Sequence, residues 1–131
     1  MKSFNIAVIA GDGFGKEVVP EGIRVVEAAG RRFGFECRWQ HFDWSCEIHL
    51  QTGRMMPADG LQQLRPFDAI FLGAVGHPSV PDHVSLWGLL IPIRRTFRQY
   101  VNLRPVRLFH GADLGAAIAN LVRQIRPRNH R

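Results

Sequence analysis

The chain has 131 residues, which suits a single domain. Its hydrophobic content of 46% and charged content of 21% are ordinary for a soluble globular protein. No apolar run is long enough to span a bilayer, and the N-terminus has no signal-peptide pattern, so we expect a cytoplasmic protein with no membrane partner. The two cysteines, Cys37 and Cys46, are too few for a disulfide framework.

Strand and helix patterns alternate along the chain. We predict strands at 4–10, 36–44 and 68–75, helices at 16–33, 59–64 and within 86–100, and an extended segment at 101–108. Gly34 is a stop signal for the first helix, and Pro20 must lie near its first turn. The continuous apolar run 68–75 is typical of a central parallel strand. This order predicts an α/β fold with a parallel sheet.

Two loops follow predicted strands, at the sheet edge where α/β proteins bind ligands. The first is the glycine-rich turn 11–15, and the second is the loop 76–85. The turn is not a phosphate loop or a G-x-G-x-x-G motif, because Ala10, Lys16 and Glu17 occupy positions that those patterns reserve for other residues. Two interpretations remain open: a plain strand-to-helix turn, or a turn that lets a ligand approach the backbone.

Cysteine and histidine occur in two pairs, Cys37-x3-His41 and Cys46-x2-His49, which resemble a zinc site. Strand alternation places Cys37, Trp39 and His41 on one face of a sheet, where such residues commonly fill a core. We therefore predict core packing here and assign no metal ligand.

The net charge of +6 is compatible with nucleic acid, an acidic membrane surface or an anionic small molecule. The excess lies in the C-terminal tail and in a run formed by Arg94, Arg95, Arg98, Arg104 and Arg107. No nucleic-acid-binding motif accompanies the tail, so we expect no nucleic-acid partner. On one helix Arg94 and Arg98 would lie on the same side, and Arg104 could converge with them. The run is either a solvated helix face or a dicarboxylate site.

Several strings together resemble one family, the isocitrate/isopropylmalate dehydrogenases. The general strings are IAVIAGDGFGKEV (6–18), FDAIFLGAVGHP (67–78), GLLIPIRR (88–95) and NLRP (102–105). Three further strings resemble the tartrate dehydrogenase and D-malate dehydrogenase branch: FDWSCE (42–47), MMPADG (55–60) and VPDHVSLWGLLIPIRR (80–95). The resemblance implies a partial doubly wound sheet, the N-terminal part of the isopropylmalate dehydrogenase-like fold.

The resemblance also implies a reaction. NAD oxidises the 2-hydroxyl of a 2-hydroxy diacid, the β-carboxylate is lost, and Mn²⁺ or Mg²⁺ acts as a Lewis acid. It implies that Arg94 and Arg104 bind substrate carboxylates and that Trp87 and Leu90 meet the variable end of the substrate. It places Phe14, Gly76 and His77 beside the cofactor; most members of the family carry Ile at the position of Phe14.

Members of this family are well over twice as long as this chain. Their catalytic residues and metal ligands come from later sequence, so we assign none here and expect an N-terminal piece without turnover. Residues 1–111 correspond to the N-terminal part of the large domain, and 112–131 form an unmatched basic tail for which a frameshift or premature stop is our hypothesis. Full-length relatives are expected to be homodimers. The alternative is a non-catalytic remnant that binds an anionic small molecule or a partner chain.

Overall fold

A computed structural model describes residues 1–105. The chain divides into two units, Met1–Tyr100 and Val101–Arg131, and only 101–105 of the second are described. Residues 101–105 form neither helix nor strand, so the described part of the predicted extended segment belongs to no sheet. The predicted tail, 112–131, lies outside the described residues.

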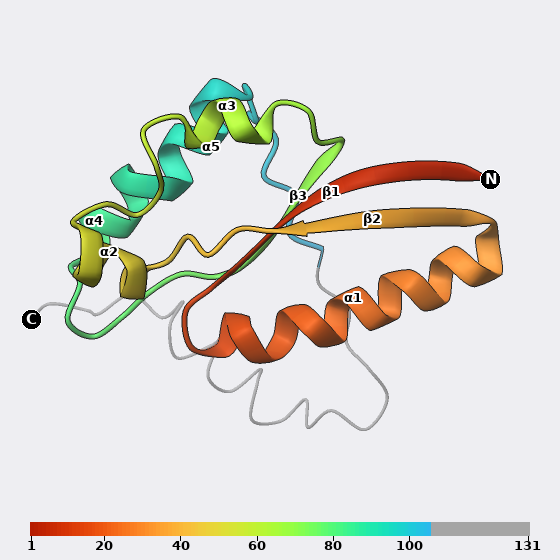
Figure 1. The fold of residues 1–131 in the computed structure, drawn as a ribbon, viewed down its shortest axis with the longest axis horizontal. Helices are drawn as coiled ribbons and strands as arrows, with labels where there is room; N and C mark the ends of the chain where they lie inside the picture. Colours follow the sequence, from red (N-terminus) through yellow and green to blue (C-terminus); the bar gives the residue numbers. More distant parts are fainter. Residues whose placement is uncertain (106–131) are drawn as a thin grey trace, which may run out of the picture. The chain divides into compact units, whose positions relative to one another are not determined.

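Strands and helices alternate along the first unit (Figure 1). They are β1 (Lys2–Gly11), α1 (Phe14–Phe33), β2 (Phe35–His41), α2 (Cys46–Thr52), α3 (Gly60–Leu64), β3 (Ala69–Ala74), α4 (Asp82–Ser85), the π-helical turn η1 (Leu86–Leu90) and α5 (Ile91–Thr96). No helix among residues 1–105 is both long and apolar enough to cross a membrane.

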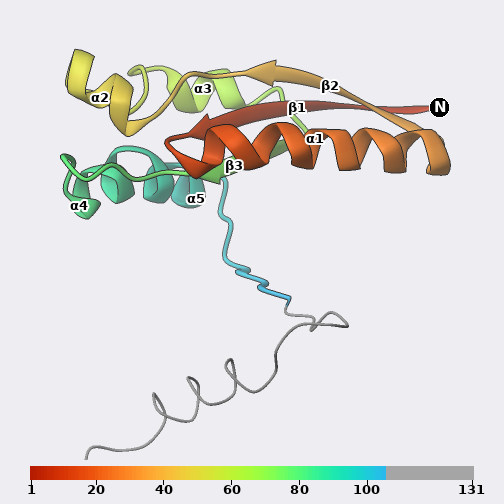
Figure 2. The same ribbon diagram turned by 90° about the horizontal axis from the view of Figure 1, so that it is seen from below.

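The three strands are parallel and lie in the order β2-β1-β3. Helix α1 covers one face of the sheet, and α2 to α5 lie toward the other (Figure 1), so the predicted partial doubly wound α/β fold is confirmed. Figure 2 shows the strands side by side, with β1 between β2 and β3. Within residues 1–105 β3 pairs with β1 alone, so the prediction that 68–75 forms a central strand is not confirmed there. Ile70, Phe71 and Gly73 are half-buried, and Ala69, Leu72 and Ala74 are exposed, so the apolar run is only partly covered there.

Each face of the sheet has its own apolar layer. Toward α1, Trp39 of β2 packs against Phe71 of β3 with ring centroids 6.0 Å apart. Cys37 and Trp39 are half-buried, as core packing predicts, whereas His41 is exposed at the strand end. On the other face lies the main core, formed by Ala7, Ile9, Trp44, Cys46, Met55, Leu64, Val80, Leu89 and Ile93.

The ends of α1 differ in how well the sequence predicts them. Gly34 ends the helix as predicted, in the left-handed conformation with φ 75°, and donates its N–H to the Gly30 carbonyl. The helix begins at Phe14, two residues before the predicted start at Lys16. Pro20 therefore lies in the second turn, and its predicted place near the first turn is wrong.

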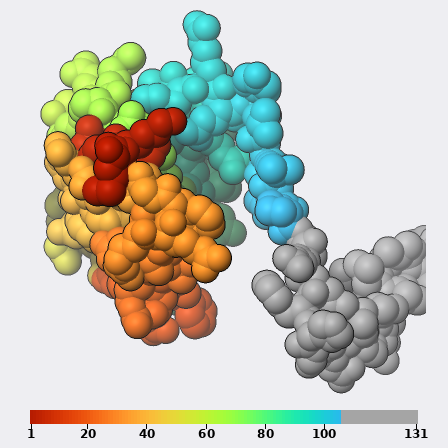
Figure 3. Space-filling model, turned by 90° about the vertical axis from the view of Figure 1, so that its right-hand side faces the viewer, coloured from red at the N-terminus to blue at the C-terminus, as the bar shows by residue number. Residues whose placement is uncertain are grey.

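The start of β1, the start of β2 and the end of α1 lie together at the far end of this unit (Figure 3). Phe4 and Phe35 pack edge to face there, with ring centroids 6.2 Å apart. This contact packs the amino ends of β1 and β2 together, at the opposite end of the sheet from the loops that follow β1 and β3.

The predicted helix within 86–100 is observed as η1 and α5, which continue α4 in one helical run from Asp82 to Thr96. Pro92 is the second residue of α5, and the backbone is helical on both sides of it. Just before it, the N–H of Ile91 donates to the Leu86 carbonyl, five residues back, which defines the π turn η1. Helix α5 ends at Thr96, and Arg98 has a left-handed φ of 50°.

We expect Ile9→Ala to lower the free energy of unfolding by roughly 2–5 kcal/mol, because it leaves a cavity in the fully buried core. Val25→Ala is the control, since Val25 is 69% exposed on α1 and its truncation should cost less than about 0.5 kcal/mol. Urea denaturation monitored by circular dichroism measures both. Equal losses in the two variants would contradict the assignment of the core.

Candidate functional site

The carboxyl ends of β1 and β3 meet at the glycine-rich turn. Gly15 packs so closely there that an added Cβ would lie 1.9 Å from the Ala10 carbonyl oxygen and 2.7 Å from the Ala74 backbone nitrogen. Gly13, by contrast, has φ 44° and open space where a side chain would lie. Gly15 thus serves backbone packing, as the first interpretation predicts, and approach of a ligand to the backbone stays a prediction.

Asp12 holds this edge of the sheet together. Its buried carboxylate accepts backbone N–H bonds from Cys46 at 3.0 Å, Glu47 at 3.1 Å and Gly76 at 3.2 Å. Its own N–H donates to the Ala74 carbonyl at 2.7 Å. One side chain thus joins the turn after β1, the start of α2 and the loop after β3.

The same carboxylate completes the N-terminus of α2. Asp12 accepts the N–H groups of Cys46 and Glu47, and the Ser45 hydroxyl oxygen accepts that of Ile48 at 3.2 Å. A helix leaves its first N–H groups without intrahelical partners, and here side chains satisfy them. Burial by itself would raise the pKa of Asp12, but the three N–H donors outweigh burial and hold its pKa below the ordinary value.

The predicted cofactor residues lie on the rim of this arrangement. Phe14 is the first residue of α1 and is 78% exposed. Gly76 donates to Asp12 and has open space where a Cβ would lie. His77 is half-buried, and its Nδ1 accepts the N–H of Ser79 at 3.1 Å. The structure therefore brings the glycine turn and the Gly76 loop together at the β1–β3 crevice, where the strand order reverses.

The predicted substrate residues lie on η1 and α5. Trp87 is 61% exposed, Leu90 is half-buried and Arg94 is exposed. The prediction that Arg94 and Arg98 stack on one helix is wrong, because α5 ends at Thr96 and the left-handed backbone at Arg98 leaves the helical path. Arg104 is exposed and belongs to the second unit, so its predicted convergence with Arg94 stays a prediction.

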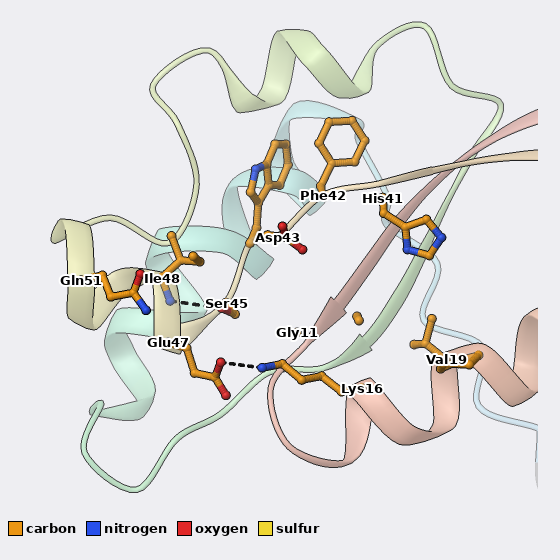
Figure 4. Close-up of a pocket in the computed structure, with 13 residues that line it drawn as sticks. Gly11, Lys16, Val19, His41, Phe42, Asp43, Ser45, Glu47, Ile48 and Gln51 are labelled. Carbon is orange, nitrogen blue, oxygen red and sulfur yellow. Dashed lines mark hydrogen bonds and ion pairs between the residues drawn. The ribbon is translucent and has the colours of Figure 1, made fainter.

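A pocket of about 380 Å³ lies beside the glycine turn, between α1 and α2 (Figure 4). Lys16 of α1 reaches across its mouth to pair with Glu47 of α2. Glu47 raises the pKa of Lys16 by accepting a hydrogen bond from its ammonium group. None of the predicted site residues lines this pocket. The pocket therefore does not support the predicted site, whose support is its position at the carboxyl ends of the strands.

Sequence reasoning missed Asp12, Lys16 and Glu47. Asp12 had a usable signal, because a carboxylate directly after a buried apolar strand and between two glycines must find backbone donors. Lys16 and Glu47 gave none, since 31 residues separate them and only the tertiary fold joins them.

Cys46 packs beside Asp12 at the start of α2. Burial, together with the hydrogen bond and negative charge of the Asp12 carboxylate, raises the pKa of its thiol to about 11. The thiol is therefore protonated at neutral pH. Among residues 1–105, no group of three or more His, Cys, Asp or Glu side chains is arranged to hold a metal ion.

Comparison with known proteins assigns the family. The sequence profile of the family described as isocitrate/isopropylmalate dehydrogenase matches residues 5–125. The chain belongs to this family. The match continues past Gly111 into residues that the structure does not describe, so the boundary predicted at Gly111 stays a prediction.

Individual relatives agree with the predicted branch. The chain is 59% identical over 113 residues to a D-malate dehydrogenase [decarboxylating] from Escherichia coli, covering 85% of this chain and 31% of the relative. It is 56% identical over 120 residues to a tartrate dehydrogenase/decarboxylase from Pseudomonas putida, covering 90% of this chain and 32% of the relative. The chain thus spans about a third of the length of these relatives.

A solved structure agrees with the fold. The chain resembles a β-decarboxylating dehydrogenase from Thermococcus kodakarensis in its apo form, with a TM-score of 0.56 and 27% sequence identity. The likeness covers 74% of this chain and 27% of that one. The resemblance stated from the sequence strings is therefore confirmed at the level of family, branch and fold.

We expect Asp12→Asn to lower the free energy of unfolding at pH 7 by roughly 2–4 kcal/mol, because three backbone donors lose a charged acceptor. The pKa of Asp12 is lowered in the folded chain, so its contribution is complete above the unfolded pKa of about 4 and is lost as the pH falls through the folded pKa. Denaturation curves from pH 7 to about pH 2 measure this. The variant should lose less stability over that range, and equal losses would contradict the role of Asp12.

We expect the Cys46 thiol to react slowly with iodoacetamide at pH 8, because it is fully buried and its pKa is about 11. Asp12→Asn should speed the reaction, since it removes the charge beside the thiol. Mass spectrometry of peptides after timed alkylation separates Cys46 from half-buried Cys37, which serves as the internal standard. Faster modification of Cys46 than of Cys37 in the unchanged chain would contradict this environment.

Proposed function

We propose that this chain is the N-terminal part of an NAD-dependent decarboxylating dehydrogenase that acts on tartrate, D-malate or a similar 2-hydroxy diacid, with Mn²⁺ or Mg²⁺ as its metal. The observation that carries the proposal is its identity of more than half to two decarboxylating dehydrogenases with these substrate names. Because the chain spans about a third of those relatives, the activity is proposed for the whole protein. A cytoplasmic location and a homodimeric whole protein are part of the same proposal.

Arg94 is the residue proposed to hold a substrate carboxylate, with Arg104 as the second. Its exposed guanidinium group has no acidic partner among residues 1–105, which leaves its donors available for a bidentate carboxylate contact. Trp87 and Leu90, one or two turns earlier, are proposed to meet the rest of the diacid. The reading of the arginine run as a dicarboxylate site is preferred here to a solvated helix face.

The residues beside the crevice suit a nicotinamide cofactor. Gly76 has open space where a side chain would lie, so a flat ring can approach its backbone, and exposed Phe14 offers an apolar surface. NAD, when bound, accepts the hydride from the carbon that carries the 2-hydroxyl group. His77, half-buried in the same loop, would bound this space, and Asp12 would hold the loop in place.

The described residues do not suit the metal. No three His, Cys, Asp or Glu side chains among residues 1–105 are placed to hold Mn²⁺ or Mg²⁺. The metal ligands are therefore proposed to come from other parts of the whole protein, and no catalytic residue is assigned in this part of the chain. If the metal ligands lie elsewhere in the whole protein, the alternative for the 131-residue chain alone is that it binds an anionic small molecule or a partner chain without turnover.

We expect Arg94→Ala to weaken binding of D-malate to the purified 131-residue chain by roughly tenfold or more, because a charged hydrogen-bond partner of the carboxylate is lost. Arg95→Ala is the matched control: Arg95 is exposed on the same helix and carries the same charge, but no site role is assigned to it. Isothermal titration calorimetry at constant ionic strength measures both.

Equal weakening in the two variants would indicate general attraction to positive charge and would contradict the site. NADH formation from D-malate with Mn²⁺, followed at 340 nm in the same samples, separates the two functions. We expect none from the 131-residue chain, and measurable turnover would show that the chain carries catalytic residues that we have not assigned.

A further inference from the structure

Gly88, in the middle of η1, packs directly against the side chain of Met55. A Cβ added at Gly88 would lie 2.6 Å from Met55 Cγ and 3.2 Å from Met55 Cβ, too close for either to stay in place. Met55 is 2% exposed within the main core, so it has little room to withdraw. Gly88 does not have a positive φ, so the position requires space and not an unusual backbone.

This contact joins two distant parts of the sequence. Met55 begins MMPADG, and Gly88 lies within VPDHVSLWGLLIPIRR, two of the three strings that resemble the tartrate and D-malate branch. Neither residue has a role in the site described above. The structure thus brings together two strings that share a resemblance to this branch and lie far apart in the sequence.

The contact also lies at a turn that sets the direction of neighbouring side chains. A π turn closes its hydrogen-bonded ring with one more residue than an α turn, so residues before it are rotated relative to those after it. Trp87 lies within the turn and Arg94 follows it. The buried residues Leu89 and Ile93 hold the two halves against the core, and Gly88 sets how closely the turn approaches.

We propose that Gly88 is a positioning residue: its contact with Met55 fixes the π turn and thereby the placement of Trp87 and Leu90 relative to Arg94, which determines the diacid that the site prefers. This inference rests on the proposed function. It requires that a side chain at Gly88 changes the preference between diacids, and that removing the Met55 side chain restores it.

The test is a double-substitution cycle on the 131-residue chain. Gly88→Ala, Met55→Ala and the double variant are compared for the ratio of the dissociation constants of D-malate and tartrate, two diacids that differ by one hydroxyl group. We expect Gly88→Ala to change this ratio roughly tenfold, the scale on which a displaced contact alters discrimination. The double variant should return to within about twofold of the unchanged chain, because the lost Met55 side chain accommodates the new methyl group.

Gly22→Ala is the matched control. Gly22 is also a helical glycine in close packing, since an added Cβ would lie 2.7 Å from the Phe71 ring, but it lies on α1 across the sheet from the main core. It should lower the melting temperature without changing the ratio. A changed ratio in Gly22→Ala, an unchanged ratio in folded Gly88→Ala, or no rescue in the double variant would overturn the proposal.

A second measurement separates this inference from the proposed function. Gly88→Ala should shift the indole N–H resonance of Trp87 and speed amide exchange at Ile91, whose N–H closes the π turn, and the double variant should reverse both. If the unchanged chain binds neither diacid, the proposed carboxylate-binding role of Arg94 in this chain and the role of Gly88 in diacid preference both fail. In that case the role of Gly88 in fixing the π turn stands if the Trp87 resonance and the Ile91 exchange rate both change, and it fails if they do not.

Discussion

The carboxylate of Asp12 is the interaction on which this end of the molecule depends. A doubly wound sheet leaves a crevice where its strand order reverses, and loops there present backbone N–H groups to a ligand. In this chain a buried side chain of the protein accepts those N–H groups, at the start of α2 and in the Gly76 loop. A ligand at this crevice would therefore bind outside this carboxylate, on the side where the proposed cofactor residues Phe14, Gly76 and His77 lie. The distance between the turn after β1 and the loop after β3 is then set before any ligand arrives.

The alternation of strands and helices could be predicted because it depends on local signals. Apolar runs located β1 and β3, and Gly34 located the end of α1, since each residue there reports its own burial or backbone conformation. The neighbour of each strand could not be predicted in this way. The run 68–75 is apolar, yet within residues 1–105 β3 pairs with β1 alone and Leu72 is 37% exposed, so apolar composition does not report which strands lie beside it.

The site shows the same division. Resemblance located Phe14, Gly76, Trp87 and Arg94, and the structure places them on exposed rims and helix faces, but their roles remain to be measured. Asp12 binds partners 34, 35 and 64 residues away, so no window of local sequence contains the interaction. The break in the helix after Thr96, which separates Arg98 from Arg94, was likewise hidden, because no Gly or Pro marks it.

The helical run that bears the proposed recognition residues depends on packing for its stability. α4, η1 and α5 form one helical run from Asp82 to Thr96 that contains a π turn and Pro92, and an isolated helix of about 12–15 residues is marginal in water even without such interruptions. Their shape must come from the core beneath them, through the buried residues Leu89 and Ile93 and the close approach of Gly88 to Met55. A π turn is rare, and here packing of its buried side against the core holds it in place. The same packing determines where the exposed side of the turn lies. The placement of the proposed recognition residues is therefore a property of the core as much as of the surface.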